Sequence, residues 1–245
     1  MVSLEKKSPP GLLSLAKKAQ VVLEKKGMAA HTASVGLCMD ISGSMAPLFQ
    51  NGTVQAVIER TLGLGLNFDD NGAIDLFAFG VQAHDLGELH PEKFKQASSD
   101  LLQRVSLEPG TMYAPPIQQV IKRYGFQPQA GFFKSLFGGK PKEAPRANPV
   151  YMLFVTDGEN SDPGPAQQAL IEASKFPIFF QFVGIGGGSF SFLRKLDDMP
   201  GRVLDNANFF EVANPSALAE EKLYEMMMVE YPAWVKQAKA KGILA

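Results

Sequence analysis

The sequence predicts an α/β fold in which a doubly wound, mostly parallel sheet of six strands carries helices on both faces. Short apolar runs alternate with segments of helical periodicity along almost the whole chain, and right-handed crossovers between parallel strands place helices on both faces of such a sheet. Two of the runs, 73–80 and 83–89, follow each other so closely that they indicate one antiparallel strand at an edge. We expect residues 1–245 to form a single domain, because 45% hydrophobic residues can build a substantial core.

The amino-acid composition argues against several classes of function. Lys and Arg number 24 and Asp and Glu number 25, which leaves a formal net charge of -1 and no overall field that would attract nucleic acid or anionic lipid. The single cysteine, Cys38, lies in an apolar run, so we expect a buried thiol. No stretch has the features of a secretory signal or of a membrane span, and we therefore expect a cytoplasmic protein.

Residues 1–30 are expected to contain an amphipathic helix that packs on the domain. Its apolar residues recur at steps of three and four, and Gly27 ends the pattern. The lysines lie mostly off the apolar stripe, which favours a docked helix with a basic face in solvent; a helix that binds a membrane surface or a partner is the alternative. The stripe consists of Leu12, Leu15, Ala16, Ala19, Val22 and Leu23.

A candidate metal site follows the first apolar run, residues 35–39. This run is short and does not alternate, as expected for a strand buried on both faces, and Asp40, Ser42 and Ser44 come next at alternate positions. A helical pattern begins beyond them, so they lie in a loop from strand to helix, where open parallel sheets bind ligands. Carboxylate and hydroxyl oxygens with so few acids suit Mg²⁺ better than zinc. Capping of the next helix by Asp40 or Ser42 is the alternative.

Two later stretches repeat this chemistry. Thr111 lies in a loop ahead of a predicted helix, and the apolar strand 149–156 ends at Asp157, which a glycine follows. Between them, the segment 125–149 is rich in Gly, Pro, Lys and Phe without a steady period, and we expect it to be a surface excursion. Its large apolar residues, Phe132 to Phe137, form either a docking knob or a short helix folded onto the body.

The remaining elements follow from the same patterns. Apolar stripes predict helices, and apolar runs bounded by glycine or proline predict strands. The expected helices cover 91–105, 117–124, 164–176 and a region around 192–199. The expected strands cover 177–186 and 208–212. A C-terminal helical segment, 216–245, is expected to be bent or interrupted at Pro232.

The polar residues at the strand ends carry a family resemblance. Asp40, Ser42, Ser44, Thr111 and Asp157 together resemble the metal-ion-dependent adhesion site of the von Willebrand factor A (vWA) domain. The resemblance implies a Rossmann-like fold in which the three hydroxyls bind Mg²⁺, with Mn²⁺ or Ca²⁺ as other candidates, while the two aspartates act directly or through water. It also implies a sixth position that is left for an Asp or Glu of a partner protein.

The likeness narrows to one branch of that family. The stretches 10–20, 201–210 and 231–234 resemble the TerF-like branch of the bacterial tellurium-resistance group of stress proteins, over almost the whole chain. This resemblance implies a role in tellurium resistance or stress response. The excursion 125–149 departs from the family pattern, and the resemblance assigns no function to its Phe- and Lys-rich content.

The motifs of enzymes are incomplete in this chain. A phosphatase-type site would need a second Asp where the chain has Ser42, and neither serine fits the Gly-x-Ser-x-Gly pattern of a serine hydrolase. The glycine-rich turn 184–189 lacks the third glycine of the dinucleotide pattern. We therefore expect a non-catalytic, metal-dependent protein-interaction module; a metal-dependent hydrolase and a passive scaffold with a structural metal are the alternatives. The sequence indicates neither the identity of the partner nor the oligomeric state.

Overall fold

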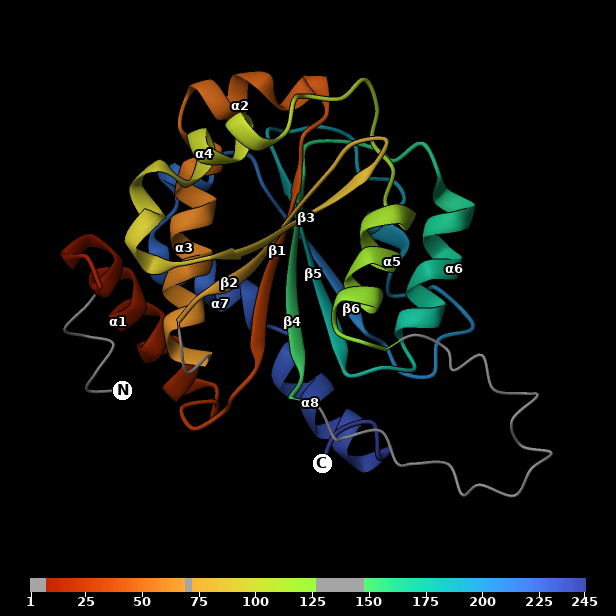
Figure 1. Cartoon of the computed structure of the whole chain (residues 1–245). Helices are drawn as coiled ribbons and strands as arrows, with labels where there is room; N and C mark the ends of the chain where they lie inside the picture. The colour runs from red at the N-terminus through yellow and green to blue at the C-terminus, as the bar shows by residue number, and fades with distance from the viewer. Residues whose placement is uncertain (1–7, 69–71, 127–147) are drawn as a thin grey trace.

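The structure is a computed structural model that describes residues 8–68, 72–126 and 148–245. Its centre is a single six-stranded sheet (Figure 1) made of β1 (Ser34–Asp40), β2 (Ile74–Phe79), β3 (Ala83–Leu89), β4 (Val150–Thr156), β5 (Ile178–Ile185) and β6 (Ala207–Val212). The strand order is β3-β2-β1-β4-β5-β6, and every neighbouring pair is parallel except β2 with β3. The predicted fold class is confirmed. The residues 127–147, which include the Phe132 to Phe137 cluster, lie outside the described part of the chain.

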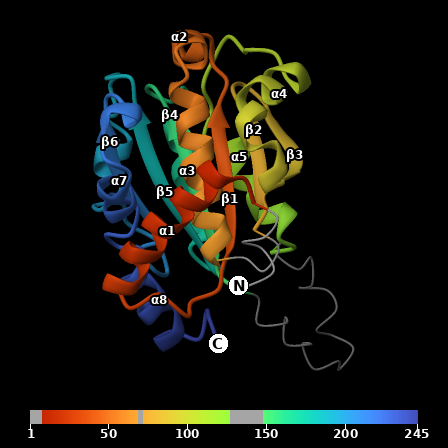
Figure 2. The same ribbon diagram turned by 90° about the vertical axis from the view of Figure 1, so that its left-hand side faces the viewer.

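Helices cover both faces of the sheet. They are α1 (Pro10–Lys25), α2 (Ala46–Gln50), α3 (Thr53–Phe68), α4 (Ala97–Arg104), α5 (Ala114–Arg123), α6 (Pro163–Ala173), α7 (Glu220–Met227) and α8 (Tyr231–Ala240), with the 3-10 turns η1 (Gly43–Met45), η2 (Pro91–Gln96), η4 (Leu193–Lys195) and η5 (Pro215–Ala217). Figure 2 shows α1, α3 and α7 together on one face, and α5 and α6 lie on the other (Figure 1). None of the helices in the described ranges is long and apolar enough to cross a membrane.

The core lies in two layers, one on each face of the sheet. In β4, Leu153 and Val155 belong to the layer beneath α1, α3 and α7, whereas Met152 and Phe154 belong to the layer beneath α5 and α6. Successive side chains of a strand point to opposite faces, so a central strand that is covered on both sides is apolar at every position. Cys38 lies in the second layer as a free, fully buried thiol, as its apolar surroundings in the sequence predict.

Several helix boundaries differ from the predicted ones. Pro232 does not interrupt the C-terminal segment: it lies in the first turn of α8, where a missing N–H costs nothing, and the break comes earlier, between α7 and α8. The stretch 91–105 divides into η2 and α4. In the region 192–199 only the turn η4 forms, since Pro200 and Gly201 follow closely and stop a longer helix.

The outer strand β3 differs in character from the rest of the sheet. It is only partly buried over most of its length, and its pairing with β2 shifts in register between Asp75 and Phe77, where the ladder bulges. Its sequence mixes apolar residues with the polar or acidic residues His84, Asp85 and Glu88. This is the antiparallel edge strand that the short connection after β2 predicts.

Helix α1 packs on α3 and α7. Its buried residues are Leu12, Ala19, Val22 and Leu23. Two polar contacts fasten the same helix: Lys18 Nζ lies 3.1 Å from Glu220 Oε2 of α7, and Asn67 Nδ2 of α3 donates to the carbonyl oxygen of Ala16 at 3.0 Å. Residues far apart in the sequence therefore hold α1 in place.

A glycine permits the close approach of these helices. A Cβ atom at Gly63 in α3 would lie 2.7 Å from the hydroxyl oxygen of Tyr224 and 2.9 Å from Cβ of Leu15. Such distances are shorter than van der Waals contact, so any larger residue would push α1 or α7 away.

The single domain expected over residues 1–245 stays a prediction.

The packing of α1 is testable with two substitutions on that helix. Leu12→Ala is expected to lower the free energy of unfolding by about 2–5 kcal/mol, because it removes a fully buried side chain and leaves a cavity. Val21→Ala should change it by less than about 0.5 kcal/mol, since Val21 is 46% exposed. Urea unfolding followed by circular dichroism measures both, and equal effects would contradict the packing described.

Candidate metal centre

The ends of β1 and β4 meet at one edge of the sheet, because the two strands are parallel neighbours. Met39 pairs with Val155 in their register. Asp40 ends β1, Thr156 ends β4, and Asp157 follows directly. The chain continues from β1 to β2 on one side and from β4 to β5 on the other, so the strand order reverses here. At such a switch point the loops diverge and leave room for a ligand.

Hydrogen bonds join four of the residues that the sequence singles out. Ser44 Oγ donates to Asp157 Oδ1 at 2.9 Å, and the hydroxyl oxygens of Ser42 and Ser44 are 3.0 Å apart. The carboxylate of Asp40 accepts two bonds, from the backbone N–H of Ser42 to Oδ1 at 2.6 Å and from Thr156 Oγ1 to Oδ2 at 2.6 Å. The structure thus brings together two carboxylates and two hydroxyls from β1, β4 and the loops that follow them.

Thr111 lies on a neighbouring loop but is less closely connected. Its backbone carbonyl accepts a hydrogen bond from Ser161 N at 2.8 Å, which ties it to the loop after β4. Within the described ranges, its hydroxyl makes no hydrogen bond to the other four residues. We refer to Asp40, Ser42, Ser44, Thr111 and Asp157 as the candidate metal centre.

The loop that carries this threonine is fastened on both sides. Gly43 N donates to the carbonyl oxygen of Glu108 at 2.9 Å, and Glu108 N donates to that of Ile41 at 2.8 Å. Beyond the threonine, Met112 N donates to the carbonyl oxygen of Gly80 at 2.8 Å. The loop is therefore joined to the ends of β1 and β2 by backbone hydrogen bonds, which leaves only a few residues between its anchors.

The side chain of Glu108 adds a second connection, which sequence reasoning missed. Oε1 lies 2.6 Å from His84 Nε2, and Oε2 accepts from Gln82 N at 2.8 Å. Burial alone would raise the pKa of Glu108, but the hydrogen bonds from His84 and from backbone N–H groups lower it overall. His84 lies on the edge strand β3, and no pattern in the sequence connects it to a glutamate 24 residues away.

Asp162 is another residue that the sequence does not identify. It is buried, and its two carboxylate oxygens accept from the backbone N–H groups of Tyr113 at 2.8 Å and Ala114 at 2.9 Å, at the start of α5. Its position before Pro163 is typical of a residue that caps its own helix, α6. Its side chain nevertheless accepts no hydrogen bond from the backbone N–H groups of α6. Instead, the carboxylate of Asp162, in the loop after β4, accepts hydrogen bonds from the start of α5. This helix begins directly after the loop that carries Thr111.

The electrostatics of the two carboxylates suit a bound cation. Burial raises the pKa of Asp40 to about 6, hydrogen bonds from Thr156 and Ser42 oppose that rise, and the charge of Asp157 adds to it. Burial also raises the pKa of Asp157, against the bond from Ser44. Two neighbouring anions that disfavour each other are stabilised when a cation lies between them. The hard oxygen donors present therefore fit a divalent ion such as Mg²⁺.

The glycine-rich turn after β5 packs against this edge. A Cβ atom at Gly188 would lie 1.9 Å from the carbonyl oxygen of Asp157, so only glycine can come so close. Glu159 accepts hydrogen bonds from Ser189 Oγ at 2.9 Å and from Ser191 N. The turn 186–192 is thereby held beside the candidate metal centre.

A second group of acids lies at the other end of the sheet. Carboxylate oxygens of Asp197, Asp205 and Glu230, before β6 and α8, are within 4.8 Å of one another. Burial is the larger cause, and the negative charges of the two neighbouring aspartates the smaller one, of a rise in the pKa of Glu230 to about 7. The guanidinium of Arg202 pairs with Asp205 and already supplies positive charge there. We assign no metal to this group.

The chain is similar in sequence to known proteins over most of its length. A family model described as vWA-TerF-like, the vWA found in the TerF C terminus, matches residues 32–244. The uncharacterized protein YcbR of Bacillus subtilis (strain 168) is 37% identical over 229 residues, which cover 93% of this chain and 88% of YcbR.

Solved structures share the fold. Proximal thread matrix protein 1 from the mussel byssus, in a structure with a zinc-occupied MIDAS motif, matches with a TM-score of 0.53 and 14% identity over 81% of this chain and 47% of that one. A von Willebrand factor type A structure from Catenulispora acidiphila matches with a TM-score of 0.50 and 15% identity over 81% and 43%. The chain therefore spans less than half the length of these two proteins, and the likeness supports the fold alone.

The bond from Asp162 to α5 gives a test of how the threonine loop is held. Asp162→Ala should lower the free energy of unfolding by about 1.5–3 kcal/mol, because two backbone N–H groups lose a charged acceptor. Asp162→Asn keeps one acceptor oxygen and should cost less. Urea unfolding measures the stability, and amide hydrogen exchange at Tyr113 and Ala114 locates the effect. Unchanged protection of these two amides in Asp162→Ala would contradict the arrangement.

Proposed function

Because the chain belongs to the vWA-TerF-like family, we propose that it is a non-catalytic protein-interaction module that binds its partner through a metal ion. The ion would be held at the candidate metal centre. One observation carries the proposal: two aspartates and two serines, joined by side-chain hydrogen bonds and by the backbone N–H of Ser42, lie where the strand order reverses. Thr111, on the adjoining loop, would supply the third hydroxyl.

Mg²⁺ is the ion that this donor set suits best. Carboxylate and hydroxyl oxygens are hard donors, and Mg²⁺ takes few carboxylates and keeps several waters. Mn²⁺ and Ca²⁺ accept the same donors and are the next candidates. The mussel protein has zinc in its MIDAS motif, so zinc belongs in any test even though the site offers no sulfur or imidazole ligand among its five residues.

The charge of the site supports an acidic partner. Only Asp40 and Asp157 offset a doubly charged ion, since the three hydroxyls are neutral. A carboxylate from a partner's Asp or Glu would complete the coordination and form a strong charge-assisted contact. We therefore propose a protein partner that presents an exposed acidic residue.

A catalytic role has less support. With a pKa of about 6, Asp40 has the strength of a general base. Its side chain is nevertheless fully buried, and both of its oxygens already accept hydrogen bonds from the protein. We therefore assign to Asp40 the role of offsetting the charge of the ion, directly or through water, and not that of taking a proton from a substrate. The family's connection with TerF supports a role in a bacterial tellurium-resistance or stress-response system. In such a system we propose that the protein binds another protein and does not hydrolyse a substrate.

Metal binding is the first test of this function. Calorimetric titration should detect binding of Mg²⁺ or Mn²⁺ to the wild-type protein, with Ca²⁺ and Zn²⁺ as further arms. Asp157→Asn should abolish it, because the amide keeps an oxygen for the bond from Ser44 but loses the charge. Without metal, this variant should unfold at the same urea concentration as the wild type or a slightly higher one, since burial disfavours the lost charge.

Asp100→Asn, which makes the same change on α4, is the control and should bind metal as the wild type does. Loss of stability without loss of metal affinity in Asp157→Asn would overturn the assignment of the site.

Partner binding is the second test. Proteins captured from a bacterial lysate in Mg²⁺ should be released by EDTA, and an identified partner should lose affinity when its candidate Asp or Glu is changed to the amide. Thr111→Ala should weaken partner binding more than Mg²⁺ binding, by about tenfold or about 1.4 kcal/mol. A partner that stays bound in EDTA would show that recognition uses another surface.

A further inference from the structure

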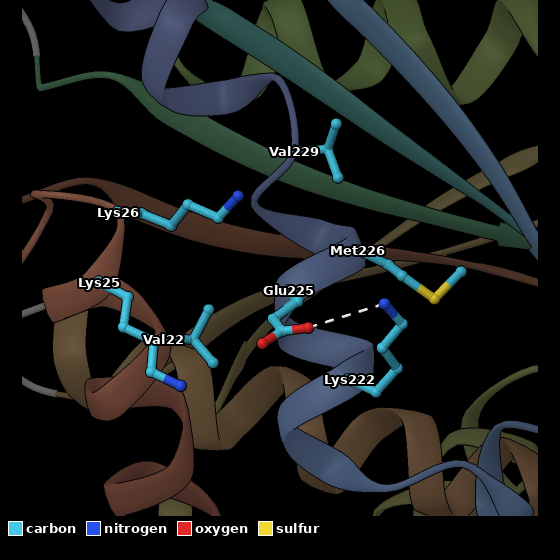
Figure 3. Close-up of a pocket in the computed structure, with 7 residues that line it drawn as sticks. All are labelled: Val22, Lys25, Lys26, Lys222, Glu225, Met226 and Val229. Atoms are coloured by element: carbon cyan, nitrogen blue, oxygen red, sulfur yellow. Dashed lines mark ion pairs between the residues drawn. The ribbon is translucent and has the colours of Figure 1, made fainter.

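A groove lies between α1 and α7 (Figure 3). Its volume is about 250 Å³, and it is open to solvent along one side. Met227, at the end of α7, accepts a hydrogen bond from the hydroxyl of Tyr151, which lies near the start of β4. Since Asp157 follows the other end of the same strand, the groove and the candidate metal centre lie at opposite ends of the sheet.

The floor of the groove is apolar. Val22 of α1, Met226 of α7 and Val229, just beyond α7, line it. Val22 is buried, but Val229 is 58% exposed, a larger exposed fraction than that of any other large apolar residue in the described ranges. An open apolar floor that includes a methionine, whose side chain adapts to different shapes, is typical of surfaces that receive an apolar side chain from a partner.

The rim of the groove is positively charged. Lys25 and Lys26 lie on the α1 side, and Lys222 lies on α7, where it pairs with Glu225 at 3.7 Å (Figure 3). Within the described ranges, neither Lys25 nor Lys26 forms an ion pair. The C-terminal ends of α1 and α7 each offset about half a charge, which leaves the rim with a net positive charge.

We propose that this groove docks an acidic segment of a partner protein, with one large apolar side chain on the floor and carboxylates beside Lys25 and Lys26. A volume of about 250 Å³ is smaller than the ~300–1,000 Å³ of pockets for small molecules, and suits one or two side chains. Apolar anchors in small pockets, ringed by charge, provide much of the affinity of such contacts. This site needs no metal and is independent of the proposed function.

Two other occupants fit less well. An anionic membrane would match the lysines, but a bilayer takes up several protruding apolar side chains, whereas Val229 is the one exposed apolar residue among those that line the groove and Val22 is buried. The chain's own segments outside the described ranges match poorly in charge: residues 127–147 contain four basic residues and one acidic residue, and residues 1–7 contain two lysines and one glutamate. A separate, acidic protein segment is the occupant that the charges favour.

Selection of short random peptides on phage against the 245-residue chain, in EDTA, tests the proposal. Enriched peptides should carry a large apolar residue flanked by Asp or Glu. Fluorescent versions of them should bind Val229→Asp and the double variant Lys25→Glu/Lys26→Glu at least about tenfold more weakly than the wild type, by anisotropy. All three positions are exposed, so the variants should keep the wild-type circular dichroism and unfolding midpoint.

The double variant Lys122→Glu/Lys195→Glu makes the same change of charge at exposed positions on α5 and η4 and should bind the peptides as the wild type does. Failure to enrich acidic peptides, or equal binding by the groove variants, would overturn the proposal. Two further outcomes would also overturn it. Binding to phosphatidylglycerol vesicles in place of the peptides would show that the groove contacts a membrane. A dimer of this chain that Val229→Asp dissociates would show that the groove binds a second copy.

Discussion

The buried carboxylate of Asp40 is the constraint on which one end of this molecule depends. A charged group with no exposed surface is tolerated only where donors surround it. The N–H of Ser42 provides one donor through the turn after β1. The hydroxyl of Thr156 provides the other, which requires β1 and β4 to end at the same level. Strand register, strand order and the shape of the loop after β1 therefore all serve one pair of oxygen atoms.

The fold and most of the candidate site were predictable because both depend on local patterns. Buried parallel strands are apolar at every position, so the runs before Asp40 and Asp157 stand out in the sequence. Parallel neighbours then bring the residues after those runs together without any knowledge of contacts. The third hydroxyl, of Thr111, was recognisable only from the family resemblance, and its part in metal binding stays a prediction.

What the sequence could not reveal are the contacts between distant residues that hold the loops. Asp162 precedes a proline in the manner of a helix cap, but its side chain binds α5, 48 residues back, rather than α6. Glu108 and His84 follow no spacing rule, because their contact depends on the path of two loops. The break before α8 was misplaced at Pro232, since a proline ends one helix and begins another equally well.

The outer strands of the sheet bear on how the protein behaves among copies of itself. A free strand edge is a template for another strand, and charge or a bulge on it opposes such pairing. On β3, the bulge beside Phe77 combines with the charges of Asp85 and Glu88. On β6, the ion pair of Glu211 with Arg194 stands beside the aromatic side chain of Phe209. Within the described part of the chain, β3 and β6 are the outer strands, and a few ionised side chains on them oppose edge-to-edge aggregation. Neutralising those side chains removes part of that protection.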